Sequence, residues 1–160
     1  MRHLVVVHAG FTDYKPLAKD EMDGLETLAA SIHETLGNCR SRVISSTAAP
    51  TIHAAEIIAK RLNLPTIHGE KFLWTGPYSP FGFPLDTTKV HLLDIVFRHS
   101  EATDGLVVVG HDEVCRILPD YYVHDMMRLE YELKPLSPGQ AVHIDLDERV
   151  FGYLPKKPAS

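Results

Sequence analysis

The sequence has little of what secreted, membrane-spanning or nucleic-acid-binding proteins need. It contains two cysteines and one tryptophan among 160 residues, and its formal net charge is −5 at pH 7. No apolar run approaches the roughly 18 residues of a membrane-spanning helix. Only four consecutive apolar residues follow residues 1–3, which is too few for a signal peptide. Because the charge balance is acidic, we expect neither nucleic acid nor a membrane as a partner.

The two cysteines, Cys39 and Cys115, have neither the spacing of metal ligands nor that of a redox motif. We expect both to be free thiols, as is usual in a reducing compartment. The sequence therefore predicts a cytoplasmic protein. Its 160 residues, 44% of them hydrophobic, suffice for one domain over residues 1–160 that buries a core without disulfides.

Two short apolar runs each end in a histidine. Residues 4–7 lead to His8 and then to Gly10, where a small residue lets the backbone turn closely, and residues 106–109 lead to His111. Uninterrupted, β-branched runs are typical of strands that are buried on both faces of a parallel sheet. Ligands of open α/β sheets bind outside the carboxyl ends of the strands. We therefore predict adjacent parallel strands whose histidines, His8 and His111, share one pocket.

Hydrophobic periodicity and turn residues predict the other elements. Helices are expected over residues 19–36, 50–62 and 87–99, the last capped by Asp86, with a fourth helix that starts near Asp112 and is ended or kinked by Pro119. The apolar face expected for the third helix consists of Val90, Leu93, Ile95, Val96 and Phe97. Further strands are expected over residues 41–46, 65–68 and 105–110.

The end of the chain favours an antiparallel hairpin. Residues 129–133 and 141–146 alternate between apolar and polar, and a Ser-Pro-Gly turn at residues 137–139 separates them, so they are predicted to pair. Residues 151–154 are predicted to form a last short strand. The fold class is therefore α/β, a three-layer α/β/α sandwich whose mostly parallel central sheet ends in an antiparallel hairpin.

Residues 74–85 fit no regular period. They include three prolines, two glycines and four aromatic residues. This composition predicts a structured loop, which serves either as a lid or binding loop or as a connection packed for stability.

Five motifs in this order resemble the histidine phosphatase superfamily, which has the phosphoglycerate mutase-like fold. The first stands where the family has Arg-His-Gly, and the fourth contains the second histidine. The motifs occupy residues 5–10, 16–19, 44–46 with 54–59, 107–111, and 136–142. The short chain is most similar to the compact branch that includes phosphohistidine phosphatases.

This resemblance implies an activity. It implies hydrolysis of a phosphomonoester or phosphoramidate through a phosphohistidine on His8, with His111 as the second catalytic histidine. The expected partner is a small phosphorylated ligand or an inorganic anion, and no cofactor is expected.

The sequence departs from the family at its phosphate-binding arginines. Val7 and Pro50 occupy the two arginine positions, and the acidic residue near the third strand falls at Trp74 or Thr75. Arginine binds phosphate through two parallel hydrogen bonds, and one lost transition-state donor costs about 3–4 kcal/mol. The alternative function is therefore a catalytically degenerate member that binds a small anionic ligand or a protein partner.

Other side chains are candidates to replace these arginines. Ser46 and Thr47 offer hydroxyl donors, and His53 lies one turn beyond Pro50 as a third imidazole. Imidazoles also suit zinc, but the spacing of His8, His53 and His111 is not specific for it, so no metal is predicted. If histidines alone bind the anion, affinity increases as pH falls through about 6.5.

The proton donor to the leaving group is left open by the sequence. Asp13, Asp112 and Glu113 are the candidates, and the sequence does not distinguish between them. Gly10 and Asp112 are also candidates to contact the bound ligand.

Overall fold

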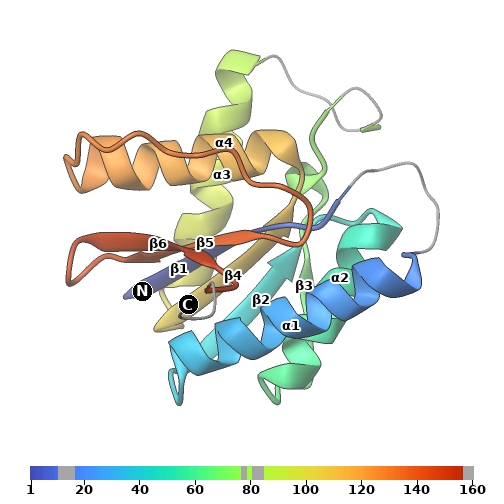
Figure 1. Cartoon of the computed structure of the whole chain (residues 1–160). Helices are drawn as coiled ribbons and strands as arrows, with labels where there is room; N and C mark the ends of the chain where they lie inside the picture. The colour runs from blue at the N-terminus through green and yellow to red at the C-terminus, as the bar shows by residue number, and fades with distance from the viewer. Residues whose placement is uncertain (11–16, 77–78, 81–84, 157–160) are drawn as a thin grey trace.

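The computed structural model describes residues 1–10, 17–76, 79–80 and 85–156. At its centre is a sheet with the strand order β3-β2-β4-β1-β5-β6 (Figure 1). The strands from β3 to β1 pair in parallel, whereas β5 is antiparallel to β1 and β6 is antiparallel to β5. The predicted α/β fold, with a mostly parallel sheet and an antiparallel hairpin at one edge, is confirmed.

The two histidine-tipped strands lie side by side in the middle of the sheet. β1 (His3–His8) and β4 (Gly105–Gly110) pair in parallel, with His8 opposite Gly110, and both strands are buried throughout. Helices cover both faces, which is why these sequences are apolar without alternation. The predicted neighbourhood of the two strands is therefore confirmed.

The outer parallel strands are shorter. β2 (Ser41–Ser45) pairs with β4, and β3 (His68–Gly69) adds two residues beyond it. The strand predicted over residues 65–68 is therefore mostly wrong. Pro65 and Thr66 are exposed and precede the point where the chain reaches β2.

Four helices of the described chain form the outer layers (Figure 1). α1 (Lys19–Leu36) and α2 (Ala49–Arg61) cover one face, and α3 (Leu85–Ser100) and α4 (Asp112–Asp120) cover the other. Alternate residues of β1 serve the two cores: Val5 and Val7 pack with α1 and α2, whereas Leu4 and Val6 pack with α3 and α4. The bounds of α1 agree with the prediction, and Gly37, at φ 57°, ends it.

The prediction for α3 is wrong in two respects. The helix begins at Leu85, so Asp86 lies inside it and does not precede it. Val90 and Phe97, which were expected in the core, are 65% and 64% exposed, while Leu92 is buried. The buried face of α3 also contains His99. Because histidine is polar, the sequence pattern did not identify this face as the buried one.

His99 is buried because its two ring nitrogens have partners. The Arg42 guanidinium donates to Nδ1 at 3.1 Å, and Nε2 donates to a Glu70 oxygen at 2.7 Å. Buried polar groups are tolerated when they are hydrogen-bonded in this way. These bonds connect α3 with β2 and with the segment after β3.

The α-helical part of α4 ends at Asp120, one residue after Pro119, close to where the sequence predicted an end or a kink. The helix includes Pro119 and continues as the π-helical turn η2 (Tyr121–Met126), which closes with a Met127 N–H to Tyr122 C=O bond of 3.0 Å. Proline has no N–H to donate within an α-helix, and the wider π-helical turn follows directly after it.

The terminal hairpin has a different partner from the predicted one. β5 (Ala141–Asp145) pairs with β6 (Val150–Leu154), while residues 129–136 have no regular structure. The turn lies after Asp145, whose carboxylate accepts the N–H groups of Asp147 and Glu148 at 3.1 and 3.0 Å. We call residues 129–136 the strap, because they run back along α4 in Figure 1.

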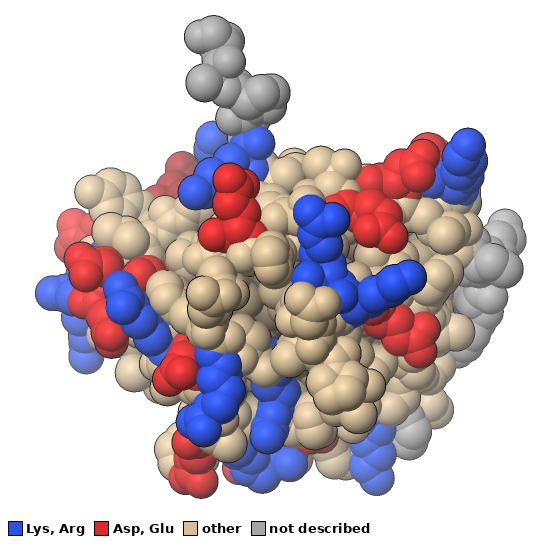
Figure 2. Space-filling view, turned by 90° about the horizontal axis from the view of Figure 1, so that it is seen from below, with Lys and Arg blue, Asp and Glu red and all other residues tan. Residues whose placement is uncertain are grey.

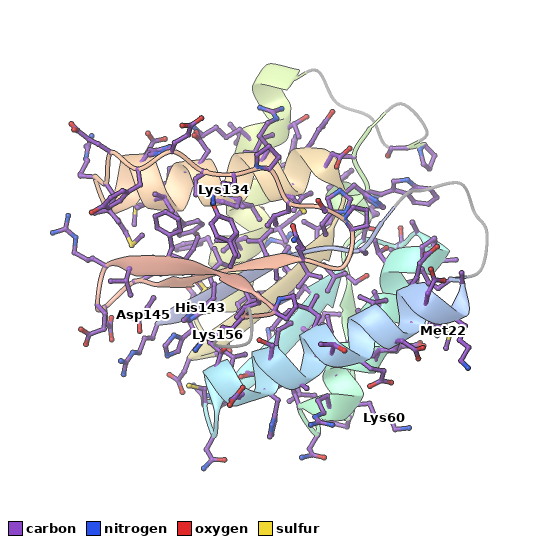
Figure 3. The ribbon with its side chains drawn as sticks, viewed as in Figure 1. Met22, Lys60, Lys134, His143, Asp145 and Lys156 are labelled. Atoms are coloured by element: carbon purple, nitrogen blue, oxygen red, sulfur yellow. The ribbon has the colours of Figure 1, made fainter. Side chains whose placement is uncertain are left out.

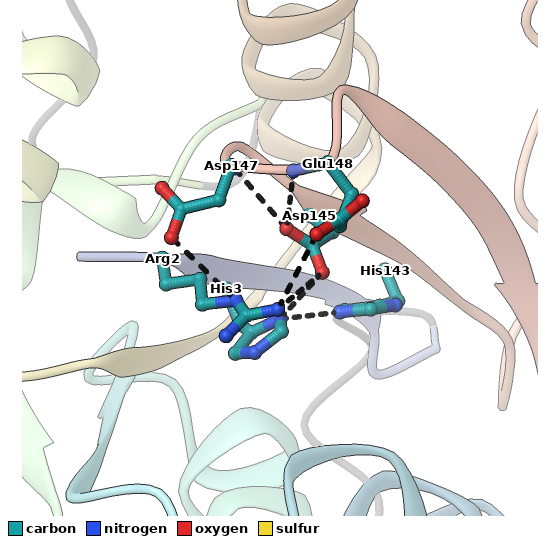
Figure 4. A network of polar contacts seen from close by, with 6 residues as sticks. All are labelled: Arg2, His3, His143, Asp145, Asp147 and Glu148. Atoms are coloured by element: carbon teal, nitrogen blue, oxygen red, sulfur yellow. Dashed lines mark hydrogen bonds and ion pairs between the residues drawn. The ribbon is translucent and has the colours of Figure 1, made fainter.

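A polar network ties β1 to β5 at the end of the sheet opposite His8 (Figure 4). His3 Nδ1 lies 3.0 Å from His143 Nε2, and an Asp145 oxygen lies 3.7 Å from both His3 and Arg2. Burial, followed by the neighbouring His3, lowers the pKa of His143 below its usual value.

The surface carries charges of both signs. Figure 2 shows lysine and arginine interspersed with aspartate and glutamate on the face seen from below. Among the described residues, no helix combines the length and the hydropathy needed to cross a membrane. Cys39 and Cys115 are free thiols, as predicted.

Candidate active site

The backbone around His8 is held on both sides. His8 N–H donates to the Gln140 carbonyl at 2.9 Å, and Gly139 N–H donates to the His8 carbonyl at 2.9 Å. On the other side, the Ala9 N–H donates to the Gly110 carbonyl at 3.3 Å. The Ser-Pro-Gly turn was predicted to join two paired strands. Instead, its backbone is hydrogen-bonded to the end of β1.

The His8 ring is nearly fully buried, with 3% of the residue exposed. Gly10, at φ +104°, turns the chain so that its N–H donates to His8 Nδ1 at 3.1 Å. Nδ1 therefore carries a lone pair, and the proton of the neutral ring lies on Nε2. Nε2 makes a short hydrogen bond with Asp112 Oδ1. Of the three acidic candidates, Asp112 is thus bonded to His8, Glu113 lies next to it in α4, and Asp13 lies outside the described residues.

His111 follows β4 and precedes the first residue of α4, with 6% of the residue exposed. Its Nε2 lies 2.9 Å from Ser46 Oγ, and Ser46 is in turn bonded to Thr51 Oγ1. Thr51 donates to the Ala48 carbonyl at 2.8 Å, so Ser46 donates to Thr51, and His111 Nε2–H donates to Ser46. This direction leaves His111 Nδ1 as a lone pair, and Nδ1 is buried without a partner among the described residues.

Burial, followed by the nearby His8, lowers the pKa of His111 to about 4, and Asp112 opposes this shift only in part. His111 is therefore neutral at pH 7 in the ligand-free protein. The rise of anion affinity through about pH 6.5 stays a prediction, but burial of the His111 ring does not favour this histidine as its source.

The other predicted site residues differ in their burial and in their contacts with the two histidines. Ser46 is buried and holds His111, whereas Thr47 is exposed. His53 is half-buried on α2 and has no hydrogen bond or ion pair to His8, Asp112 or His111 within the described chain. Three groups therefore come together at the carboxyl ends of β1 and β4: the two imidazoles and one carboxylate.

Val7 and Pro50, which occupy the two expected arginine positions, are both buried. Val7 is fully buried in the core on the side of α1 and α2, and Pro50 is buried in the first turn of α2. Neither side chain can contact an anion through a charge.

A cavity of about 530 Å³ extends from His8 between α4 and the strap. Its cations are Arg116, one turn after Asp112 in α4, and Lys134, which Figure 3 shows on the strap in front of α4. Sequence reasoning missed both residues. Arg116 lies four residues after Asp112, a helical spacing that would have revealed it, whereas Lys134 directly follows residues 129–133, which were mistaken for a strand. The residues lining the cavity are His8, Asp112, Glu113, Cys115, Arg116, Pro119, Asp120, His124, Glu132, Leu133, Lys134, Pro135, Leu136, Val142 and Tyr153.

The strand order and the helical layers correspond to an α/β fold that recurs in solved structures, the phosphoglycerate mutase-like fold. An α-ribazole phosphatase from Shigella flexneri superposes with a TM-score of 0.66, at 14% identity over 93% of each chain. The protein histidine phosphatase SixA, complexed with tungstate, gives 0.61 at 16% identity over 94% of this chain and 93% of its own. A phosphoglycerate mutase from Plasmodium falciparum gives 0.61 at 14% identity over 99% of this chain and 96% of its own.

At these identities the solved structures establish the fold. The sequence matches no protein-family model and, at a significant level, no curated protein.

Proposed function

We propose that the protein is a phosphohydrolase of the histidine phosphatase type. It cleaves a phosphomonoester or phosphoramidate through a phosphohistidine on His8, without a metal or other cofactor. The observation that carries the proposal is the buried His8, bonded to Asp112 and near the buried His111, at the carboxyl ends of two central strands. The tungstate complex of a protein with the same fold supports an oxyanion as ligand.

The hydrogen bonds of His8 determine which nitrogen attacks. Asp112 holds the Nε2 proton, so the available lone pair lies on Nδ1, where the Gly10 N–H now donates. As the phosphoryl group enters, this N–H turns from the ring to a phosphoryl oxygen. The Asp112 carboxylate stabilises the positive charge that the ring acquires when it attacks phosphorus.

The substrate reacts as the monoanion, which brings its own proton. The Nδ1 lone pair forms the N–P bond, the bond from phosphorus to the leaving group breaks, and the phosphoryl proton moves to the leaving-group oxygen or nitrogen. The products are the neutral alcohol or amine and a phosphohistidine whose ring still carries the Nε2 proton. Water then attacks phosphorus and the N–P bond returns its electrons to Nδ1, which releases dihydrogen phosphate.

The monoanion also suits the electrostatics of the site. A dianion next to Asp112 would meet a negative charge, and no arginine stands at positions 7 and 50 to offset it. The P–OH group of the monoanion can donate to the unpaired Nδ1 of His111, which lacks a hydrogen-bond donor in the ligand-free state.

A phosphatase screen with phosphoramidate and 4-nitrophenyl phosphate tests the proposal. His8→Ala should abolish phosphate release, and His33→Ala, an exposed histidine on α1, serves as the matched control. Release that survives in His8→Ala would reject His8 as the nucleophile.

A second candidate function is favoured by Val7 and Pro50. With both arginine positions replaced, the same pocket would bind a phosphorylated ligand or protein partner without hydrolysing it. Anion binding to a protein that releases no phosphate from any screened substrate would favour this candidate.

The cellular setting and the extent of the domain are part of the proposal. The free thiols of Cys39 and Cys115 support a reducing compartment, the cytoplasm. Solved structures of the same fold extend over more than nine-tenths of the chain, which supports one domain over residues 1–160.

A further inference from the structure

We propose that the cavity between α4 and the strap binds the leaving group of the substrate, and that this group is an extended apolar one, aromatic or aliphatic. The inference rests on the proposed function for its catalytic meaning. It predicts binding, however, even if no phosphate is released.

The cavity reaches the proposed nucleophile, His8. His8 and Asp112 line one part of it, and Tyr153 of β6 lines another, so one space joins the nucleophile to the surface of the sheet. Its volume of about 530 Å³ is within the usual range of small-molecule sites. The cavity therefore has room, next to His8 and Asp112, for a substituent far larger than a water molecule.

The walls are mainly hydrocarbon. They come from α4, the strap and β5, and the apolar residues among them are Pro119, Leu133, Pro135, Leu136 and Val142. Leu133 and Leu136 are half-buried and pack against the main core on this side of the sheet. An apolar ligand would remove this surface from water, at about 25 cal/mol for each Å² buried.

Several polar atoms of the walls are already engaged within the protein. The Tyr153 hydroxyl accepts the Lys134 N–H at 2.7 Å, and the Cys115 thiol donates to the Val7 carbonyl at 3.5 Å. His124 bonds through Nε2 to the Tyr131 carbonyl at 2.7 Å and through Nδ1 to Asp120 at 2.9 Å. A ligand rich in hydroxyl groups would lose its hydration there without gaining new partners. This disfavours sugars and small hydroxy acids as leaving groups.

The same bonds hold the strap in place over the cavity. The His124 and Tyr153 contacts attach the strap to η2 and to β6. Charged side chains also line the cavity: Arg116, Glu132 and Lys134 are exposed, and Glu113 is half-buried. The cavity therefore combines mainly apolar walls with exposed charged side chains.

Phosphonates test this inference on the unmodified protein, because their P–C bond resists phosphatase hydrolysis. Calorimetric affinities are compared for methylphosphonate, 2,3-dihydroxypropylphosphonate, phenylphosphonate and 2-naphthylphosphonate. We expect affinity to increase about five- to ten-fold from methyl to phenyl and again from phenyl to naphthyl. The dihydroxypropyl compound should bind no more tightly than the methyl compound. Equal affinities across the series, or preference for the dihydroxypropyl compound, would overturn the inference.

A pair of strap variants locates the effect. Leu136→Gln should remove most of the naphthyl preference and leave methylphosphonate affinity unchanged. Leu129→Gln is the matched control, because Leu129 is a half-buried strap leucine outside this cavity. An equal loss of the naphthyl preference in both variants would contradict binding of the apolar group in this cavity. If Leu136→Gln does not fold, the ligand series on the unmodified protein still decides the inference.

The two proposals fail in different ways. Graded phosphonate binding without any phosphatase activity would reject the proposed function and leave the apolar site intact. Hydrolysis that depends on His8 but shows no preference in the phosphonate series would do the reverse.

Discussion

Asp112 reaches from the surface to the buried nitrogen of His8. The Asp112 side chain is 81% exposed, whereas the imidazole that it contacts through Nε2 is almost completely buried. One residue at the start of α4 therefore brings a carboxylate, still largely hydrated, into contact with the proposed nucleophile. Together with the Gly10 N–H on Nδ1, this contact determines which ring nitrogen of His8 carries the proton.

Changing Asp112 should lower the rate of phosphate release without unfolding the protein. Asp112→Asn keeps the shape but removes the charge that stabilises the phosphorylated ring, so we expect kcat to fall about 10²-fold or more. Because the side chain is exposed, the free energy of unfolding should change by less than about 1 kcal/mol. The neighbouring Glu113→Gln serves as control, and an equal loss of kcat there would remove the special role of Asp112.

The stability of the ligand-free protein should decrease in acid because of His111. The pKa of about 4 in the folded protein lies below the ordinary value of 6.5, so the unfolded chain binds a proton first as pH falls. Between pH 6.5 and pH 4 this difference should cost about 3 kcal/mol of unfolding free energy. Above pH 6.5 the cost is absent, because the ring is neutral in both states.

Urea unfolding of the protein and of His111→Gln at pH 7 and pH 4.5 measures this term. His143 and His68 also have lowered pKa values and contribute in the same direction, whereas His124, whose pKa is raised, opposes them. The comparison with His111→Gln cancels these shared contributions. An identical loss of stability in both proteins would show that His111 does not resist protonation.

Phosphate release should increase as pH falls from 8 to 5.5, because the monoanion is the reactive form. The second pKa of a phosphate monoester is about 6, so the midpoint should follow the substrate. Aryl phosphates with more acidic second ionisations should shift it downward in parallel. A midpoint that is the same for all substrates would assign it to a protein group instead.

Anion binding should follow the same direction. Calorimetric titration of inorganic phosphate should give weaker binding at pH 8 than at pH 5.5. Tight binding that is equal at both values would mean that a permanently charged residue replaces the arginines. Arg116→Gln and Lys134→Gln, in the cavity next to His8, would then identify it.

The fold was predictable where one physical pattern dominates a segment. The apolar runs of β1 and β4 and the amphipathic face of α1 gave correct bounds and pairing. The pattern misled where a side chain finds a partner far away in the sequence. His99 is buried through Arg42 and Glu70, so the apolar stripe of α3 was misplaced. The Asp145 turn, made by backbone N–H groups, redirected the hairpin.

The candidate site was predictable in part for the same reason. His8 and His111 follow from the two strands, since carboxyl ends of parallel strands meet at one edge of a sheet. The contact of Asp112 with His8 could be learned only from the structure. The cavity was not predictable, because the strap that encloses it has the alternation of a strand. Its Tyr131 faces solvent, whereas Leu133 faces the cavity.

The central claim is the phosphohistidine on His8, and trapping it is the most direct test. The protein is incubated with phosphoramidate, quenched in alkali, and examined by mass spectrometry and phosphorus NMR. We predict the addition of one phosphoryl group on His8, at Nδ1, which is absent in His8→Ala and unchanged in His33→Ala. Substrate turnover with no phosphoryl adduct on His8, or with the adduct on another residue, would contradict the account.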